Sequence, residues 1–219
     1  MSFWGEDVNV AILARVLQLM DALERQGGTP IGALDFHAFA YLANVLSPLW
    51  AIEPIDDSIL KDKTKLGPYY PKLQRGLETL VGRGLVEVVE LRNTKSISEF
   101  PQRATFRLSH GPARQALEQI GDLPDEQDTA FFLQELAGAF LEIKDDKRDD
   151  AAALDATFSD PSIASDRVID FGDFTGRRSP NPSWNTAETF QRYAPKGVTL
   201  NRAEKLAMYV RLLKRKANG

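Results

Sequence analysis

The sequence predicts an α+β fold that is mostly helical, and two patterns support that prediction. Apolar residues recur at every third or fourth position through much of the chain, which is typical of amphipathic helices packed on a common core. Apolar and polar residues alternate strictly in a stretch near residue 105, which indicates a β-strand. The chain has 219 residues, of which 43% are hydrophobic and 26% charged, and this composition excludes a wholly disordered protein.

Two helices are predicted at the beginning of the chain. Residues 7–25 have an apolar stripe at helical spacing, and two glycines end this helix. Thr29 and Pro30 fit an N-cap followed by a proline in the first turn, so we expect the second helix to begin there and to end near Pro48. Residues 51–68 contain prolines, glycine and paired aspartates, which predicts a loop.

A third helix and two strands follow the loop. The helix is predicted to open at Pro71 and to end at glycines, and the apolar run 85–89 begins the first strand. After a turn, the second strand alternates, with Phe106 and Leu108 on one face and Arg107 on the other. Three helices followed by two strands around a turn is the order of a winged-helix module.

Four segments are expected along the chain. In order they are a winged-helix module (1–121), a helical extension (122–156), an aromatic-rich, loop-like segment (157–200) and a basic C-terminal helix (201–219). The extension has an apolar stripe from about residue 125 to 146. The aromatic-rich segment combines prolines and glycines with Phe, Trp and Tyr, so we expect it to pack on its own domain or on a partner. Asn201 fits the N-cap of the last helix.

Charge is distributed in blocks, although the net charge is only −4. Residues 61–107 have ten basic and five acidic side chains, and residues 200–219 have six basic and one acidic. Phosphate affinity depends on local positive potential, so a nucleic-acid contact would involve these blocks. The candidate phosphate contacts on the third helix and the wing are Lys72, Arg75, Arg83, Arg103 and Arg107. The alternatives are a solvated face of mixed charge or a protein-contact surface.

The sequence shows no catalytic or metal-binding motif. It has no cysteine and two histidines, and it lacks the phosphate-binding glycine loops, the nucleophile elbow and the zinc-binding helix motif. Asp35 and His37 are two residues apart and point in different directions on a helix, which favours a structural histidine. The aspartates within 145–150 are interpreted as a solvated helix end, because no glycine shapes an oxygen cage. We expect a protein that is not an enzyme, with no cofactor and no metal.

The expected location is the cytoplasm. No apolar run approaches the length of a transmembrane helix. The first ten residues lack the basic and apolar regions of a secretory signal.

Two stretches of sequence bear a family resemblance. The first is RVLQLMDALERQGGTPIGALDFHAFAYLANVLSPLW together with LGPYYPKLQRGLETLVGRGLVEV. The second is DATFSDPSIASDRVIDFGDF together with NPSWNTAETF. These stretches lie between residues 15 and 190 and resemble the middle component of bacterial three-component ABC-ATPase defence systems of the Lamassu type.

The resemblance implies a small adaptor that assembles with an SMC-like ABC ATPase and an effector, commonly a nuclease. Such a protein would supply neither ATP hydrolysis nor cleavage, and it could contact DNA within the complex. The implied docking surfaces are the aromatic-rich segment and the last helix. The interface candidates are Asp170, Phe171, Phe174, Trp184 and Phe190. The alternative is that these side chains cover the core of this protein.

Two other functions stay open at this point. A winged-helix transcriptional regulator would be a homodimer whose DNA affinity falls steeply with salt. The basic block 61–107 supports it, and the acidic remainder of the chain opposes it. An enzyme would have to use Asp35 with His37, or the aspartate cluster.

Overall fold

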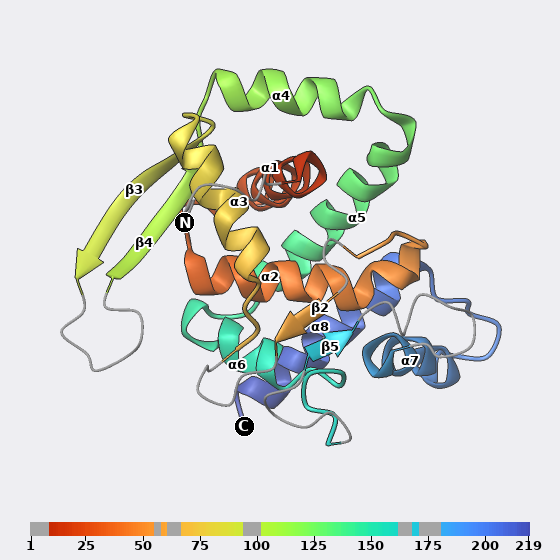
Figure 1. The fold of residues 1–219 in the computed structure, drawn as a ribbon. Helices are drawn as coiled ribbons and strands as arrows, with labels where there is room; N and C mark the ends of the chain where they lie inside the picture. Colours follow the sequence, from red (N-terminus) through yellow and green to blue (C-terminus); the bar gives the residue numbers. More distant parts are fainter. Residues whose placement is uncertain (1–8, 55–57, 61–66, 94–101, 162–167, 171–180) are drawn as a thin grey trace.

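The computed structural model describes residues 9–54, 58–60, 67–93, 102–161, 168–170 and 181–219. Within these ranges the protein is a mostly helical α+β structure with a small antiparallel sheet (Figure 1). The helices are α1 (Val10–Arg25), α2 (Ala33–Leu46), α3 (Pro71–Gly82), α4 (Pro112–Gly121), α5 (Pro124–Leu141), α6 (Arg148–Ala153), α7 (Pro182–Thr189) and α8 (Arg202–Ala217). The strands are β1 (Ile31–Gly32), β2 (Ser58–Leu60), β3 (Val86–Asn93), β4 (Gln102–Leu108) and β5 (Val168–Asp170). Short 3-10 turns are η1 (Ser47–Trp50), η2 (Asp145–Lys147) and η4 (Phe190–Tyr193).

Helix α2 lies at the centre of the core. Every residue from Phe36 to Leu46 is buried, because the helix is apolar on nearly all sides and is surrounded by other elements. It packs against α5, α6 and α7 and against strands β1 and β4 (Figure 1). The N-terminal and C-terminal parts of the chain therefore share one core. Among the helices of the described ranges, none has both the length and the apolar character needed to cross a membrane.

The main sheet has the order β1-β4-β3, with all pairs antiparallel. The alternation predicted for the second strand is confirmed, since Phe106 and Leu108 are buried and Arg107 is exposed. The register shifts between Val88 and Glu90, where β3 has one extra residue opposite β4. Strand β3 forms one edge of this sheet.

Three strands, β1, β2 and β5, were not expected from the sequence. The prediction that a helix begins at Thr29-Pro30 is wrong: Ile31 pairs with Phe106 as part of β1, and α2 begins at Ala33. The physical reason is that Ile31 is buried in the core, where it extends the sheet. The predicted loop over 51–68 contains β2, whose Ile59 pairs with Ile169 of β5.

Two helical predictions also need correction. The long helix expected to reach residue 146 ends at Leu141, and α6 follows after a short break. The segment expected to be loop-like contains α7, whose N-cap Asn181 accepts a hydrogen bond from the backbone N–H of Trp184 at 2.7 Å. The predicted N-cap of α8 is confirmed, because Asn201 forms a capping box with Glu204.

The side chain of Asp155 joins the two ends of the chain. Asp155 is fully buried, and its carboxylate accepts hydrogen bonds from the hydroxyls of Tyr41 on α2 and Tyr209 on α8, both at 2.6 Å. Ser183 on α7 donates to both carboxylate oxygens at 2.8 Å. Two backbone N–H groups, those of Thr157 and Phe158, complete the shell at 2.9 and 3.1 Å.

The hydroxyls of Tyr41 and Tyr209 stay protonated and act as hydrogen-bond donors to Asp155. Burial raises the pKa of Tyr41 and of Tyr209 well above the usual value, and the charge of Asp155 raises both further. Their hydroxyls therefore keep their protons across the physiological range. A buried carboxylate that is surrounded by donors avoids the cost of an unpaired charge.

We predict that Asp155→Asn lowers the free energy of unfolding by about 2–4 kcal/mol. The amide has one acceptor oxygen in place of two, and its NH2 group would meet the Tyr209 hydroxyl, which already accepts from the N–H of Ala156 at 3.1 Å. Urea unfolding followed by circular dichroism measures the difference. Asp128→Asn, on the exposed face of α5, is the matched control and should change stability by less than about 0.5 kcal/mol. Equal stabilities for the two variants would contradict the structural role of Asp155.

Candidate functional site

The five candidate phosphate contacts lie on or next to α3 and on β4, two elements that each contact β3. Lys72, Arg75 and Arg83 are exposed on or just after α3, while Arg103 and Arg107 are exposed on β4. Helix α3 packs against β3, which pairs with β4, so these side chains belong to the same part of the molecule (Figure 1). The residues that the charge pattern singled out are therefore exposed on elements connected through β3.

Acidic side chains lie beside Arg107 and beside other polar side chains on the same elements. Arg107 donates to Glu87 at 2.9 Å across the β3–β4 ribbon, and Arg92 donates to Glu90 at 2.5 Å. On α3, the amide of Gln74 donates to Glu78 at 2.9 Å, so a carboxylate stands on the helix surface that would face a groove. These pairs reduce the net positive potential that phosphate binding requires.

His37 lies between α2 and α3 in a structural position. It is buried, and its Nδ1 accepts a hydrogen bond from the backbone N–H of Tyr70 at 3.4 Å. Its Nε2 lies 3.1 Å from Oε1 of Gln74, which fits a neutral ring with the proton on Nε2. Asp35 forms an ion pair with Arg148 instead of meeting His37. The structure does not bring Asp35 and His37 together as an acid–base pair.

The aspartate run at residues 145–150 is not a simple solvated helix end. Arg148 is buried, bonds Asp35 at 3.1 Å and Asp145 at 2.8 Å, and stacks on the ring of Phe140 at 5.2 Å from its centre. The interpretation as a solvated helix end fits the exposed Asp145, Asp146 and Asp150, while Arg148 and the half-buried Asp149 attach the run to the core. Among the described residues, no group of three His, Asp or Glu side chains is arranged to hold a metal ion.

Asp149 is the acid of this run with a perturbed pKa. Burial is the main cause, and the nearby charges of Asp35 and Asp150 add to it, while Arg103 acts in the opposite direction. Together they raise the pKa of Asp149 to about 6. The carboxylate is thus ionised at neutral pH in a place that disfavours its charge.

The interface candidates of the aromatic-rich segment have different environments. Trp184 and Phe190 are half-buried and pack against the core. Asp170 is the last residue of β5 and pairs with Ser58 of β2. Phe171 and Phe174 lie outside the described residues. Trp184 and Phe190 therefore fit the alternative expectation, in which these side chains cover the core of this protein.

Tyr193 is a surface residue that the sequence interpretation did not single out. Its exposed fraction is 81%, and Val198 in the following turn is 46% exposed. The side chain of Gln191 closes this turn, because it donates to the carbonyl of Val198 at 2.9 Å and accepts from the N–H of Leu200 at 2.8 Å. The exposed tyrosine therefore stands on a turn of defined shape. In the sequence, only the aromatic composition of residues 157–200 pointed towards Tyr193.

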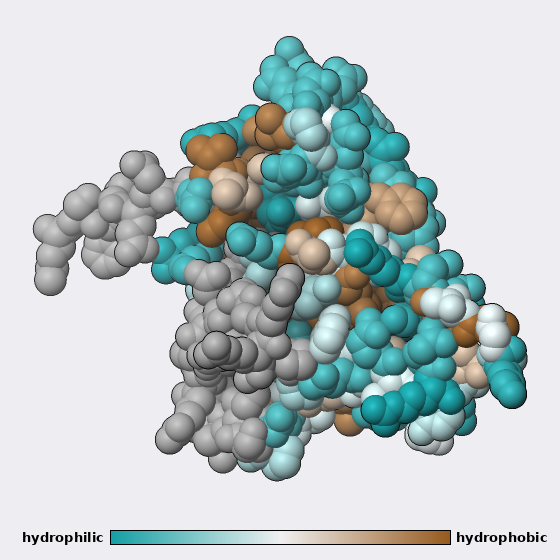
Figure 2. Space-filling model, turned by 90° about the vertical axis from the view of Figure 1, so that its right-hand side faces the viewer, coloured by the Kyte–Doolittle hydropathy of each residue, from teal (hydrophilic) through white to brown (hydrophobic). Residues whose placement is uncertain are grey.

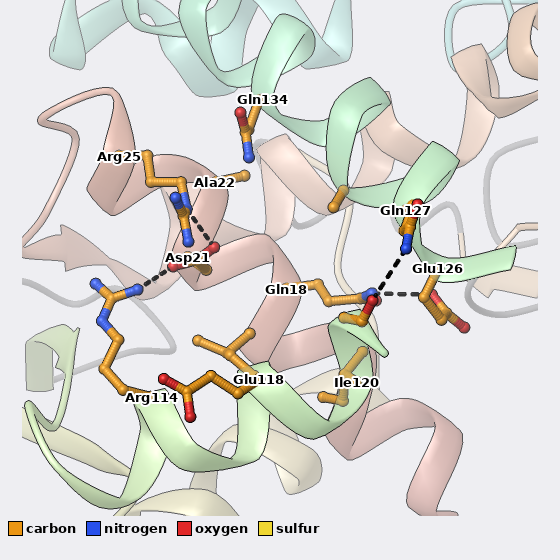
Figure 3. A pocket seen from close by; sticks show the side chains of 13 residues that line it. Gln18, Asp21, Ala22, Arg25, Arg114, Glu118, Ile120, Glu126, Gln127 and Gln134 are labelled. Atoms are coloured by element: carbon orange, nitrogen blue, oxygen red, sulfur yellow. Dashed lines mark hydrogen bonds and ion pairs between the residues drawn. The ribbon is translucent and has the colours of Figure 1, made fainter. Parts of the chain in front are cut away.

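A hollow of about 300 Å³ lies between α1, α4 and α5 (Figure 3). Its polar lining includes Gln18, Asp21, Arg25, Arg114, Glu126 and Gln134. Asp21 binds both Arg114 and Arg25, the latter at 2.6 Å, and Gln18 donates to Glu126 at 2.8 Å. Because these charges pair with one another, we interpret the hollow as a polar junction that positions α4.

Hydrophobic residues are dispersed on the face shown in Figure 2. Brown residues form small groups among hydrophilic ones in the coloured part of that view. Contiguous apolar patches mark many interaction sites, and small dispersed groups are ordinary for a monomer surface. A docking site on this face would therefore depend on individual anchors.

Comparison of the chain with protein-family models, with curated proteins and with solved structures gave no match.

We predict that Asp149→Asn stabilises the protein at pH 8 by about 1–3 kcal/mol, since one pKa unit corresponds to about 1.4 kcal/mol. A folded-state pKa of about 6, above the ordinary 3.8, means that the folded protein holds this proton more tightly than the unfolded chain. Wild-type stability therefore falls as pH rises from about 4 to above 6, and the variant lacks this loss. Urea unfolding at pH 4, 6 and 8 measures it. Asp146→Asn, at an exposed position, is the control, and a pH-independent difference for Asp149→Asn would contradict the assignment.

Proposed function

We propose that this protein is a non-catalytic adaptor that docks other proteins through the turn bearing Tyr193. The observation that supports this function best is the large exposure of one tyrosine on a turn held in shape by side-chain hydrogen bonds. Tyrosine is enriched among the residues that dominate binding energy at protein interfaces. A fixed turn also loses little conformational entropy when a partner binds.

The N-terminal module of the adaptor is, in this proposal, a winged helix. Support comes from the order α1-β1-α2-α3-β3-β4, interrupted only by η1 and the short β2, and from the antiparallel sheet β1-β4-β3. Helix α3 packs on α1, so its outer face is presented together with the β3–β4 ribbon. This module is used for DNA binding in many proteins, and the surface charges decide whether that use fits here.

The charge pairs on this surface favour protein contact. Glu87, Glu90 and Glu78 each sit beside a basic or amide side chain on the face that would meet phosphates. A surface of alternating charge suits a protein partner with its own alternating charges. We therefore favour the adaptor function over that of a DNA-binding regulator.

The turn bearing Tyr193 is tied to the rest of the molecule. Glu188 at the end of α7 forms an ion pair with Lys205 of α8 at 2.7 Å. Both helices also contribute to the shell around Asp155, through Ser183 and Tyr209. A partner bound at Tyr193 would therefore be connected, through these contacts, to α7, α8 and the core.

The partners in this proposal are an SMC-like ABC ATPase and an effector such as a nuclease, as the sequence resemblance implies. The adaptor would hold the effector against the ATPase in one state of the complex. A change of the ATPase on sensing DNA would then alter the fit and release or activate the effector. Such a switch needs only different affinities for the two states.

We predict that Tyr193→Ala weakens binding to the ATPase or the effector by about 10- to 100-fold, the loss typical of an interface hot spot. The test is to co-express the chain with the proteins encoded by its flanking genes, to weigh any complex by light scattering, and to titrate wild type and variant by calorimetry. Phe131→Ala on α5, where the ring is 55% exposed, is the matched control and should bind like wild type. Unchanged affinity of Tyr193→Ala would place docking elsewhere, and the absence of any complex would remove the adaptor proposal.

A DNA-binding regulator is the second candidate, because α3, its C-cap Arg83 and β4 together contain the five exposed basic residues. If all five contacted phosphates, duplex affinity would fall about 500-fold between 50 and 200 mM salt. Under the adaptor proposal, fluorescence anisotropy of a 30-base-pair duplex should show weak binding that Arg83→Ala barely changes. Tight, steeply salt-dependent binding that Arg83→Ala and Arg103→Ala reduce would favour the regulator.

A further inference from the structure

The free edge of β3 exposes a row of apolar side chains. Strand β4 pairs with one edge of β3, and no strand of the described residues pairs with the other. Val88, Val89 and Leu91 are 45%, 46% and 61% exposed. An exposed apolar edge strand is a template on which another strand can pair. This edge is therefore a candidate interaction surface.

The register with β4 assigns each side chain of β3 to a face of the sheet. Val88 lies opposite Phe106 and Leu91 opposite Ala104, so both belong to the face that also packs on the core. Glu87 lies opposite Arg107 and Arg92 opposite Arg103, so these two belong to the outer face. The bulge between Val88 and Glu90 is the reason that residues five positions apart share a face.

We infer that the occupant of this edge is β3 of a second copy of the chain, paired antiparallel about a two-fold axis between residues 89 and 90. In this register Glu87 lies opposite Arg92 of the second copy, and Val88 lies opposite its Leu91. The pairs Glu87–Arg92 and Val88–Leu91 then each share a face, and each Glu87 meets an arginine of the other copy, while Glu90 lies opposite Val89 at the bulge. The strand is therefore complementary to itself, as a two-fold interface requires.

Neighbouring registers are unfavourable. A shift of one residue in one direction places Glu90 opposite Glu90 of the second copy, which sets like charges against each other. A shift in the other direction places Glu87 opposite Leu91, although the two side chains belong to different faces. Charge and side-chain face together therefore favour this pairing over the two adjacent registers.

The resulting contact is small. About six residues of each copy take part, which is below the size of a standard stable interface, so we expect a dissociation constant of roughly 10–100 µM. Glu87 and Arg92 are partly or largely exposed in the single chain, at 42% and 72%, so changing them leaves the fold intact. The inference does not depend on the adaptor function.

The test uses charge reversal at the two ends of the strand. Glu87→Arg gives a chain with arginines at both ends of β3, and Arg92→Glu gives one with glutamates at both ends. In a homodimer of either variant, like charges face each other across the interface. In a mixed dimer of the two variants, opposite charges face each other. Sedimentation velocity from 5 to 500 µM should show that the wild type dimerises and that each variant alone self-associates at least about tenfold more weakly. The equimolar mixture of the two variants should dimerise.

Arg202→Glu makes the same change of charge at an exposed position on α8 and should dimerise like wild type. Thermal unfolding by circular dichroism verifies that every variant is folded. Amide hydrogen exchange of residues 86–92 should slow with wild-type concentration. A monomeric wild type at 500 µM, or a mixture that associates no better than either variant alone, would overturn the inference.

Discussion

A buried carboxylate without donors around it would cost several kcal/mol, and this constraint determines how the C-terminal part of the protein packs. Asp155 is fully buried, and the hydroxyls that satisfy it come from α2, α7 and α8. Tyr41 and Tyr209 are far apart in sequence, so the single carboxylate fixes elements from both ends of the chain at one point. The surface that α7 and α8 present, including the turn with Tyr193, takes its position from this cluster.

The exposed surfaces differ in how far their charges are already satisfied. On the β3–β4 ribbon, glutamates lie beside the arginines and lower the local positive potential. At the edge of β3 the same glutamates and arginines can serve a second strand, because the edge leaves backbone groups and aliphatic side chains available. Tyr193 instead presents an uncharged aromatic ring that is largely exposed. Charge pairing therefore separates surfaces that suit proteins from surfaces that suit phosphate.

Local patterns predicted the elements that form through local interactions. Helices α1, α3 and α8 followed from their apolar stripes and caps, and Asn201 was identified as a cap because its role depends on residues three positions away. Strands β1, β2 and β5 could not be predicted, since two or three residues show no alternation and their partners lie far along the chain. The role of Asp155 depends on Tyr41 and Tyr209, which no spacing connects. The exposure of Tyr193 likewise follows only from packing.

Helix α4 stands apart from the other helices in the way it is held. Ala113 is its one fully buried residue, and Arg114 ties the helix to Asp21 and Glu24 of α1 beside a hollow. Ion pairs weaken in salt far more than apolar contacts do, and segments with few apolar contacts open locally at low cost. Ionic strength should therefore change how firmly Arg114 holds α4 on α1, while Ala113, Leu117 and Ile120 keep the helix packed on the core.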